Sequence, residues 1–344
     1  MTSLSSSPSL LRAAVIGCGG RGRAQADGYA QVPNAQIVAL ADPVAQAALD
    51  LAHKHDVPSE GIHTDYHALL QAQPLDMLSI CTWPAQHAEQ VLAAIGSGVR
   101  AILCEKPMAP TMGEARAMHQ AARAANVQLS FCHQRRFNPQ FVRARQLIRD
   151  GAIGKVRRLE GFCPNLFDWG THWFDIWNFL NDEAPAESVM GQIDISEART
   201  VFGAWVESSG LSYVQFSNGV TGLMSTGRDQ WNGCAIRVIG EGGILEAPKP
   251  DGGDLRLLRF GHDWEIASLQ GLPSGDATIL SVQDVAAALR EGREAELSSR
   301  KALQATELIF ATYESARRGA KIKLPLDIDD SPLVDLIQKR DAAL

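Results

Sequence analysis

The chain has 344 residues, which corresponds to about two domains at the usual length of roughly 150 residues each. Its composition, 45% hydrophobic and 21% charged, is that of a globular protein and excludes collagen-like, disulfide-scaffold and disordered classes. The formal charge of −7 argues against general nucleic-acid binding. The chain has no apolar stretch of about 18 residues, so we expect no membrane span.

The first 133 residues alternate short apolar runs with longer segments of helical period. Residues 1–10 are Ser-rich and predict a disordered tail; they lack the features of a signal peptide, which favours a cytoplasmic protein. Five apolar runs predict strands over residues 11–17, 36–41, 76–82, 99–104 and 127–132. Strands that alternate with helices form a parallel sheet covered on both faces, so we expect a doubly wound α/β Rossmann domain over residues 11–133.

The pattern changes after residue 133 and predicts a second, α+β domain over residues 134–344. Helices are expected over residues 138–149, 171–181, 278–291 and 301–318. Alternating segments predict strands over residues 155–163, 211–216, 221–226 and 235–239, with a hairpin turn at Ser217-Asn218-Gly219. We therefore expect an open, mostly antiparallel sheet, and a C-terminal helix that could pack back on the first domain.

The cysteines and histidines form no metal or redox motif. No two of the six cysteines fall within four residues of each other, and several lie in apolar runs, which predicts reduced, buried thiols. The histidines at positions 53, 55, 63 and 67 have a spacing that matches no metal site. We therefore expect no bound metal.

A glycine-rich turn follows the first predicted strand and opens a predicted helix. Its residues, Gly17-Cys18-Gly19-Gly20-Arg21-Gly22, fit the G-x-G-x-x-G pattern of dinucleotide-binding folds. Gly17 permits the tight turn, Gly19 lets the backbone approach a pyrophosphate, and Gly22 lets the helix pack on the strand. The N-terminus of the helix then presents free N–H groups and the positive end of its dipole to the anion.

Asp42 ends the second predicted strand, 20 residues after Gly22. A carboxylate at this distance accepts hydrogen bonds from the adenosine ribose and repels a 2′-phosphate, which favours NAD over NADP. Arg21 and Arg23 are cations that could offset this preference, so NADP remains the alternative. Asp42 before Pro43 could also cap the next helix, and the two roles are compatible.

Two further motifs lie where strands end, at the edge of a parallel sheet that binds ligands. They are Cys104-Glu105-Lys106-Pro107 and Thr82-Trp83-Pro84-Ala85-Gln86-His87. With the glycine turn and a later Asp168-Trp169-Gly170-Thr171-His172, the chain resembles the glucose–fructose oxidoreductase/inositol dehydrogenase (Gfo/Idh/MocA) family. The resemblance covers nearly the whole chain and includes residues 136–139, 151–155 and 315–326.

The resemblance implies roles for residues that match the family's motifs. Lys106 matches the active-site lysine, Pro107 a proline that is often preceded by a cis bond, and Asp168 and His172 the catalytic pair. The remaining matches line the nicotinamide and its ribose: Thr82, Trp83, Pro84, His87 and Glu105. Trp83 departs from the family, which often has Pro at this position. The family also implies a homo-oligomer, a dimer or a tetramer.

The chemistry of these residues suits oxidation of a secondary alcohol, which needs a hydride acceptor and a base for the hydroxyl proton. An unperturbed imidazole changes charge near neutrality, which makes a histidine such as His172 suitable as the base. Lys106 can hold the reacting oxygen and stabilise negative charge that develops on it. Asp168 could orient the imidazole or bind the lysine, whereas a structural hydrogen bond is the favoured role of Asp175.

Candidates for binding a polar substrate lie around the same motifs. Trp169, Trp173 and Trp177 recur at a spacing of four, a stripe more typical of a core, but Trp169 lies inside the catalytic motif and could stack on a sugar. Arg136 and Asn165 are further candidates, besides Lys106 and His172, with Arg135 supported by position alone.

The sequence thus predicts reversible hydride transfer between NAD and a secondary alcohol or ketone of a sugar, cyclitol or derivative. An NAD-dependent glycosidase, which oxidises a ring carbon transiently, eliminates the aglycone and reduces the ring again, is the alternative. A non-catalytic NAD-sensing protein is a third reading, against which the intact Lys106, Asp168 and His172 argue.

Overall fold

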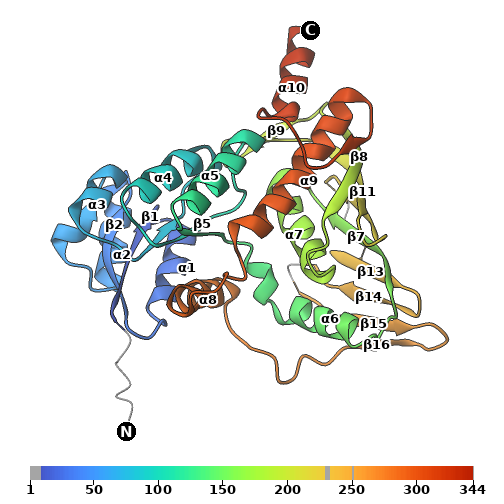
Figure 1. The fold of residues 1–344 in the computed structure, drawn as a ribbon, viewed down its shortest axis with the longest axis horizontal. Helices are drawn as coiled ribbons and strands as arrows, with labels where there is room; N and C mark the ends of the chain where they lie inside the picture. The colour runs from blue at the N-terminus through green and yellow to red at the C-terminus, as the bar shows by residue number, and fades with distance from the viewer. Residues whose placement is uncertain (1–8, 229–232, 250–251, 344) are drawn as a thin grey trace. The chain divides into compact units, whose positions relative to one another are not determined.

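The computed structural model describes residues 9–228, 233–249 and 252–343 (Figure 1). The chain divides into two compact units. The first contains the described residues up to 105 together with residues 118–132 and 275–298. The second contains residues 106–117, 133–274 and those from 299 onward. The tail predicted over residues 1–10 lies almost entirely outside the described residues.

The first unit is built on a six-stranded parallel sheet in the order β3-β2-β1-β4-β5-β6. This is the Rossmann strand order, so the predicted doubly wound α/β fold is confirmed. The strands are β1 (Leu11–Ile16), β2 (Ala35–Ala41), β3 (Ile62–His63), β4 (Met77–Ile80), β5 (Ala101–Cys104) and β6 (Gln128–Phe131). Each predicted strand is present; β3 was missed because two residues cannot show a hydrophobic run.

Helices connect these strands in the sequence. They are α1 (Gly20–Tyr29), α2 (Ala45–Lys54), the short η1 (Ser59–Gly61), α3 (Tyr66–Ala72), α4 (Pro84–Gly96) and α5 (Met112–Ala124). A later helix, α8 (Ala277–Glu291), also belongs to this unit and packs against α1. Val282 of α8 lies so close to Gly28 of α1 that a Cβ at Gly28 would approach its side chain to 2.7 Å.

The second unit is built on a nine-stranded sheet in the order β16-β15-β14-β13-β7-β12-β11-β8-β17. All of its strand pairs are antiparallel except β7 with β12, so the predicted open, mostly antiparallel sheet is confirmed. Its strands are β7 (Val156–Cys163), β8 (Ala186–Asp194), β11 (Ser209–Phe216), β12 (Thr221–Thr226), β13 (Ile236–Gly240), β14 (Gly243–Ala247), β15 (Arg256–Arg259), β16 (Trp264–Ile266) and β17 (Ile322–Lys323). A separate ribbon pairs β9 (Arg199–Val201) with β10 (Ala204–Val206).

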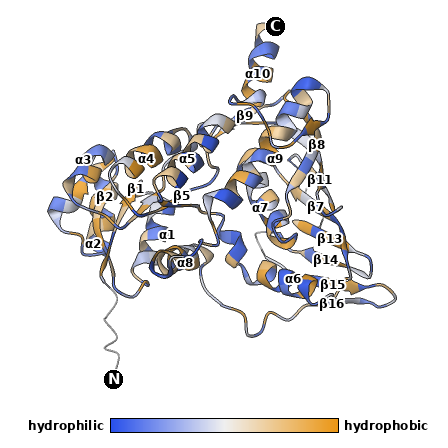
Figure 2. Ribbon diagram, viewed as in Figure 1, coloured by the Kyte–Doolittle hydropathy of each residue, from blue (hydrophilic) through white to orange (hydrophobic). Residues whose placement is uncertain are grey.

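The helical segments of the second unit are η2 (Gln134–Phe137), α6 (Pro139–Arg149), η3 (Leu166–Gly170), α7 (Thr171–Leu180), α9 (Ser299–Arg318) and α10 (Pro332–Ala342). Helix α6 is amphipathic and carries both hydrophobic and hydrophilic residues along its ribbon (Figure 2). Phe141, Ala144 and Leu147 form its buried face, a spacing of three that places them on one side of a helix.

Helix α7 packs closely on the sheet because two strands offer glycine beneath it. A Cβ at Gly222 of β12 would lie 2.5 Å from the Trp177 ring, and one at Gly161 of β7 would lie 3.3 Å from it. Trp173 and Trp177 are fully buried here, as expected for a core stripe. Removing either ring would cost about 3–5 kcal/mol, so this packing fixes the position of α7.

All six cysteines are free thiols, five of them buried, in agreement with the prediction from their spacing. Burial is the main cause that raises the pKa of the thiols, and it raises that of Cys234 to about 11. Among the described residues, no helix combines the length and the hydropathy that a membrane crossing requires.

Candidate functional site

The glycine turn joins β1 to α1 with the geometry that each glycine was predicted to provide. Gly17 has a φ of +86°, and a Cβ at this position would lie 2.7 Å from the carbonyl oxygen of Cys81. A Cβ at Gly22 would lie 1.9 Å from the Gly17 oxygen, so only glycine lets α1 start here. Gly19 is exposed, with nothing within 4 Å of where its Cβ would be. The turn therefore leaves its backbone open to a ligand.

Asp42 follows β2 and is bound to the same turn. Its Oδ2 accepts a hydrogen bond from the Cys18 N–H at 2.7 Å, and its Oδ1 accepts one from the Val44 N–H at 2.8 Å, next to the start of α2. Burial, and then the charge of Asp42, raise the pKa of the Cys18 thiol to about 12. Two carboxylate oxygens can accept about four hydrogen bonds, so capacity remains for ribose hydroxyls.

Arg21 lies in the glycine turn but its guanidinium is engaged inside the first unit. Its Nε donates to Glu105 at 2.9 Å, and its Nη2 lies 3.3 Å from the hydroxyl of Thr278 on α8. Burial lowers the pKa of Arg21, but the charge and hydrogen bond of Glu105, together with the Cys132 and Cys81 thiols, raise it by more, so the net shift is upward. Glu105 is itself buried and also accepts a bond from Gln25 at 2.8 Å. Arg21 therefore has less freedom to attract a 2′-phosphate.

The loop after β4 and the first turn of α4 together hold four of the expected cofactor residues. Thr82 donates to Gln90 at 2.6 Å through its hydroxyl, and its carbonyl lies 3.1 Å from Nε2 of the buried His87. Pro84 begins α4, where its fixed φ suits the first helical position. Trp83 precedes it with a relative exposure of 61%. The indole is thus the side chain of this loop that is available to a ligand.

This half of the candidate site fits a dinucleotide. The open glycine turn, the first-turn N–H groups of α1 and a carboxylate with spare acceptor capacity match the pyrophosphate and the ribose of NAD in chemistry. The α1 first turn carries no acidic residue that would repel a phosphate. Gly17, Gly19, Gly22 and Asp42 would hold the cofactor.

In the second unit, Lys106 and Asp168 meet although 62 residues separate them. Lys106 Nζ donates to Asp168 Oδ1 at 2.6 Å and to the Asp168 carbonyl at 3.1 Å. Both side chains are largely buried, with exposures of 17% and 13%. The peptide bond between Lys106 and Pro107 is cis, as the resemblance implied. Because this ion pair is largely buried, its geometry is fixed, and it can make a directional contact with a third polar group.

Asp168 lies on a π-type turn, η3, that runs directly into α7. The Gly170 N–H donates to the Asn165 carbonyl at 2.9 Å, the i to i+5 bond that defines this turn. Asn165 Oδ1 accepts the N–H groups of Asp168 at 2.7 Å and Trp169 at 3.3 Å, so its side chain caps the turn. His172 follows in the first turn of α7 and is 4% exposed. Isolated π turns often occur at functional sites.

Trp169 lies on this turn and is the half-buried member of the tryptophan stripe. Its ring centroid is 6.5 Å from that of Trp173. The guanidinium carbon of Arg135 is 5.5 Å from the Trp169 ring centroid and 4.9 Å from the Trp173 ring centroid. Arg135 therefore makes cation–π contacts with both indoles and restrains the Trp169 ring.

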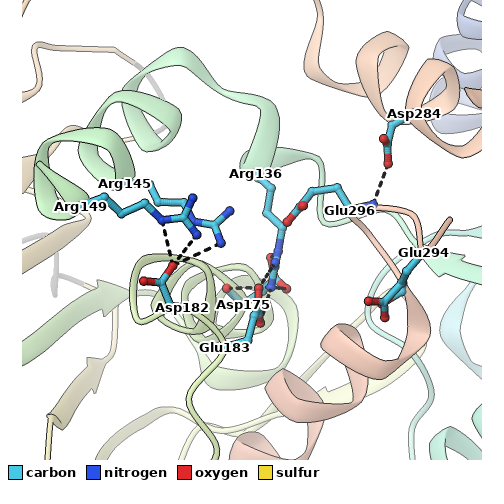
Figure 3. A network of polar contacts seen from close by, with 10 residues as sticks. Arg136, Arg145, Arg149, Asp175, Asp182, Glu183, Asp284, Glu294 and Glu296 are labelled. Carbon is cyan, nitrogen blue, oxygen red and sulfur yellow. Dashed lines mark hydrogen bonds and ion pairs between the residues drawn. The ribbon is translucent and has the colours of Figure 1, made fainter. Parts of the chain in front are cut away.

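Arg136, expected to contact substrate, is instead enclosed by two carboxylates (Figure 3). Its Nε and Nη2 both donate to Asp175 at 2.8 Å, and its Nη1 donates to Glu183 at 2.5 Å. Burial lowers the pKa of Arg136, but the charge and hydrogen bonds of Asp175 and Glu183 raise it above its ordinary value. Since Asp175 is three residues after His172, this cluster anchors the helix that carries His172.

His133 was not singled out from the sequence, although it lies next to the candidate residues. Its Nε2 is 2.9 Å from the Thr171 hydroxyl, and its ring centroid is 5.8 Å from that of His172, edge to face. It lies two residues after the end of β6, and residues that follow a parallel strand often bind ligands, so that position in the sequence was the available signal.

The fold and these contacts define an NAD-binding oxidoreductase of the Rossmann class, and comparison with known families identifies it further. Residues 11–133 match the profile of an oxidoreductase family with an NAD-binding Rossmann fold, and residues 155–324 match the α/β C-terminal domain of the same family. The chain belongs to this glucose–fructose oxidoreductase/inositol dehydrogenase/MocA family, and it is an enzyme.

Relatives with assigned names span nearly the whole chain. D-apiose dehydrogenase of Paraburkholderia graminis is 26% identical over 94% of this chain and 92% of its own length. The NAD⁺-dependent scyllo-inositol 2-dehydrogenase of Bacillus subtilis is 25% identical over 91% of this chain and 96% of its own length. The solved structure of a levoglucosan dehydrogenase with NADH and levoglucosan has a TM-score of 0.78 at 20% identity, and covers 93% of this chain and 100% of that one.

Proposed function

We propose that the protein transfers a hydride reversibly between NAD and a secondary alcohol or ketone of a sugar, cyclitol or derivative. The family supports hydride chemistry, and the names of the two whole-length relatives, a pentose and an inositol dehydrogenase, support the substrate class. The observation that carries the proposal is the contact of Lys106 with Asp168 on the turn that leads to His172.

Each residue has a distinct task in this proposal. Gly17, Gly19, Gly22 and Asp42 would hold NAD, which would supply the acceptor for the hydride of the carbinol carbon. His172 accepts the hydroxyl proton on an imidazole nitrogen during oxidation and returns it during reduction. Lys106 donates a hydrogen bond to the reacting oxygen and stabilises its negative charge, and Asp168 keeps the ammonium group in place.

We propose three different roles for the side chains around these residues: stacking on the substrate, supporting the turn or helix, and contacting the cofactor. Trp169 presents an indole face on which the C–H face of a sugar can stack. Asn165 and Arg136 contribute indirectly, because the former caps the turn and the latter anchors α7. Glu105 and the loop of Thr82, Trp83, Pro84 and His87 are assigned to the nicotinamide side, with Arg21 holding Glu105.

A panel of sugars, polyols and inositols, each incubated with enzyme and NAD, tests the proposal through the absorbance of NADH. We expect net NADH formation with at least one secondary alcohol, and a turnover by His172→Ala that is lower by about 10²–10⁴-fold. Turnover of a substrate that is unaffected in His172→Ala would contradict the assigned base. Glycoside cleavage without NADH accumulation would favour the alternative, a glycosidase with transient ring oxidation.

We also propose that copies of the chain associate through the outer face of the nine-stranded sheet. Met190 of β8 pairs with Tyr213 of β11, and both, together with Leu211, are about half exposed on this face. Exposed apolar side chains in a row favour association. Analytical ultracentrifugation should show a dimer or tetramer that Leu211→Glu with Tyr213→Glu dissociates; a monomeric wild type would contradict the proposal.

A further inference from the structure

We propose that Glu207 is a positioning residue that holds the η3 turn, and with it Asp168, in its reactive place. This inference rests on the proposed function, since it assumes that Asp168 works with Lys106 on substrate. Glu207 stands between β10 and β11 and shares no sequence motif with the candidate catalytic residues. Its side chain is completely buried inside the second unit.

Three donors from three other elements converge on the Glu207 carboxylate. The Leu166 N–H, at the start of η3, donates to Oε1 at 2.6 Å. The hydroxyl of Thr226 at the end of β12 donates to the same oxygen at 2.9 Å, and the hydroxyl of Tyr313 on α9 donates to Oε2 at 2.7 Å. All three donors are neutral. The carboxylate thus connects the turn to the sheet and to the long helix α9.

The turn needs this acceptor because of where it begins. The first N–H groups of a helical segment have no partner within the segment, and Leu166 and Phe167 at the start of η3 are buried. Asn165 Oδ1 accepts those of Asp168 and Trp169, but the Leu166 N–H points to Glu207. Asn165 and Glu207 together therefore cap η3. Asn165 directly precedes the turn in the sequence, whereas Glu207 comes from a distant part of the chain.

The position of Asp168 depends on this cap. Asp168 is two residues after Leu166 on the same turn, and its Oδ1 must stay 2.6 Å from Lys106 Nζ to hold the ammonium group. Misplacing a reacting group by about 1 Å can cost on the order of 10²-fold in rate. Loss of the cap would let the turn shift, so Glu207 controls kcat without touching substrate.

Substitutions of Glu207 separate its two properties, shape and charge. Glu207→Gln is close in shape: the amide oxygen can accept the bonds of Leu166 and Thr226, while the amide N–H₂ donates to the Tyr313 oxygen. Glu207→Ala removes the acceptor. Glu314→Ala is the matched control, since Glu314 is a buried carboxylate in the same unit that is paired with Arg317 and Arg318 rather than with the turn.

With a substrate that wild type oxidises, we expect Glu207→Ala to lower kcat by roughly 10- to 100-fold. The dissociation constant for NAD should stay unchanged, and Glu207→Gln should recover most of the lost kcat. Glu314→Ala should lower the melting temperature and leave kcat unchanged. The inference would be overturned if a folded Glu207→Ala protein had the same kcat as Glu314→Ala. It would also be overturned if Glu207→Gln lost as much kcat as Glu207→Ala.

If Glu207→Ala gives no folded protein, Glu207→Asp keeps the carboxylate but is one methylene too short to reach Leu166 and Tyr313 together. Its kcat should fall, and an unchanged kcat would overturn the inference.

Hydrogen exchange measured by mass spectrometry in a peptide covering residues 163–170 needs no substrate. Faster exchange there in Glu207→Asp than in Glu314→Ala supports the cap, and equal exchange overturns it. An absence of turnover in wild type refutes the proposed function only.

Discussion

Each of the two units contains one turn that we assign to the candidate site. The two turns differ in where the residues that hold them lie in the sequence. The glycine turn of the first unit is made by backbone geometry within six residues, and its partners include the Ala41 carbonyl at the end of β2 and the adjoining Asp42. The η3 turn of the second unit is held by Asn165 beside it and by Glu207, 41 residues further along. The first turn is therefore recognisable as a motif, whereas the supports of the second are not.

This difference follows from the chemistry that we propose for each turn. A pyrophosphate is recognised by backbone N–H groups, which any sequence provides once glycine allows the approach. Acid–base chemistry on a hydroxyl needs named side chains in fixed positions, and buried neighbours must hold them. Such neighbours are supplied by whichever strands and helices pack there, so they lie far away in the sequence.

The strongest test of this separation is Lys106→Ala and His172→Ala. Each should leave NAD affinity nearly unchanged, because the glycine turn lies in the other unit. We expect His172→Ala to lose about 10²–10⁴-fold in kcat and Lys106→Ala about 10²–10³-fold. The double variant should cost much less than the product, because the residues act together. Titration of NAD alongside steady-state kinetics checks both parts, and a joint loss of NAD affinity would break the separation.

The buried cluster under α7 gives the next largest effect. Arg136→Ala leaves Asp175 and Glu183 buried without their cation, which should cost about 3–5 kcal/mol of unfolding free energy. Arg149→Ala is the matched control, because Arg149 pairs with Asp182 at the surface and should cost only about 0–1 kcal/mol. Urea unfolding measures both. Equal losses in the two variants would show that the cluster does not anchor α7.

A smaller effect is expected at the cofactor turn. Asp42→Ala should weaken NAD binding and relax the rejection of NADP, since each hydrogen bond lost from a charged group is worth roughly 1.5–3 kcal/mol. Asp65→Ala is a suitable control, because Asp65 accepts the His67 N–H at the start of α3 and lies outside the turn. Calorimetry with NAD and NADP measures the change. Tighter binding of NADP than NAD by wild type would contradict the role of Asp42.

The smallest effect is the pH dependence of stability at Glu207. Burial raises the pKa of this carboxyl above its ordinary value, so the native state holds the proton more tightly than the unfolded chain. Wild-type stability therefore falls as pH rises from the unfolded pKa, about 4.3, to the raised native pKa. Glu207→Gln lacks this titration, so its melting temperature relative to wild type should rise over that window and then level off. A relative decrease would contradict the buried charge.

Much of the fold could be predicted because most of its strands coincide with short hydrophobic or alternating runs in the sequence. Five strands of the parallel sheet and the hairpin turn at Asn218-Gly219 were expected from hydrophobic period and turn residues. The two-residue β3 was too short to produce a pattern. Helix α8 gives no sign in its sequence that it packs on α1, since an apolar face does not specify its partner.

For the site, the sequence by itself predicted the cofactor turn and Asp42 from a motif with a defined chemical reason, and it predicted Lys106, Asp168 and His172 from the resemblance to the family. Only the tertiary structure decided that Lys106 contacts Asp168, that Arg136 is closed off by Asp175 and Glu183, and that Glu207 reaches Leu166. The physical reason is that a buried polar group must find a partner wherever packing places one, and packing brings together segments that no local pattern relates.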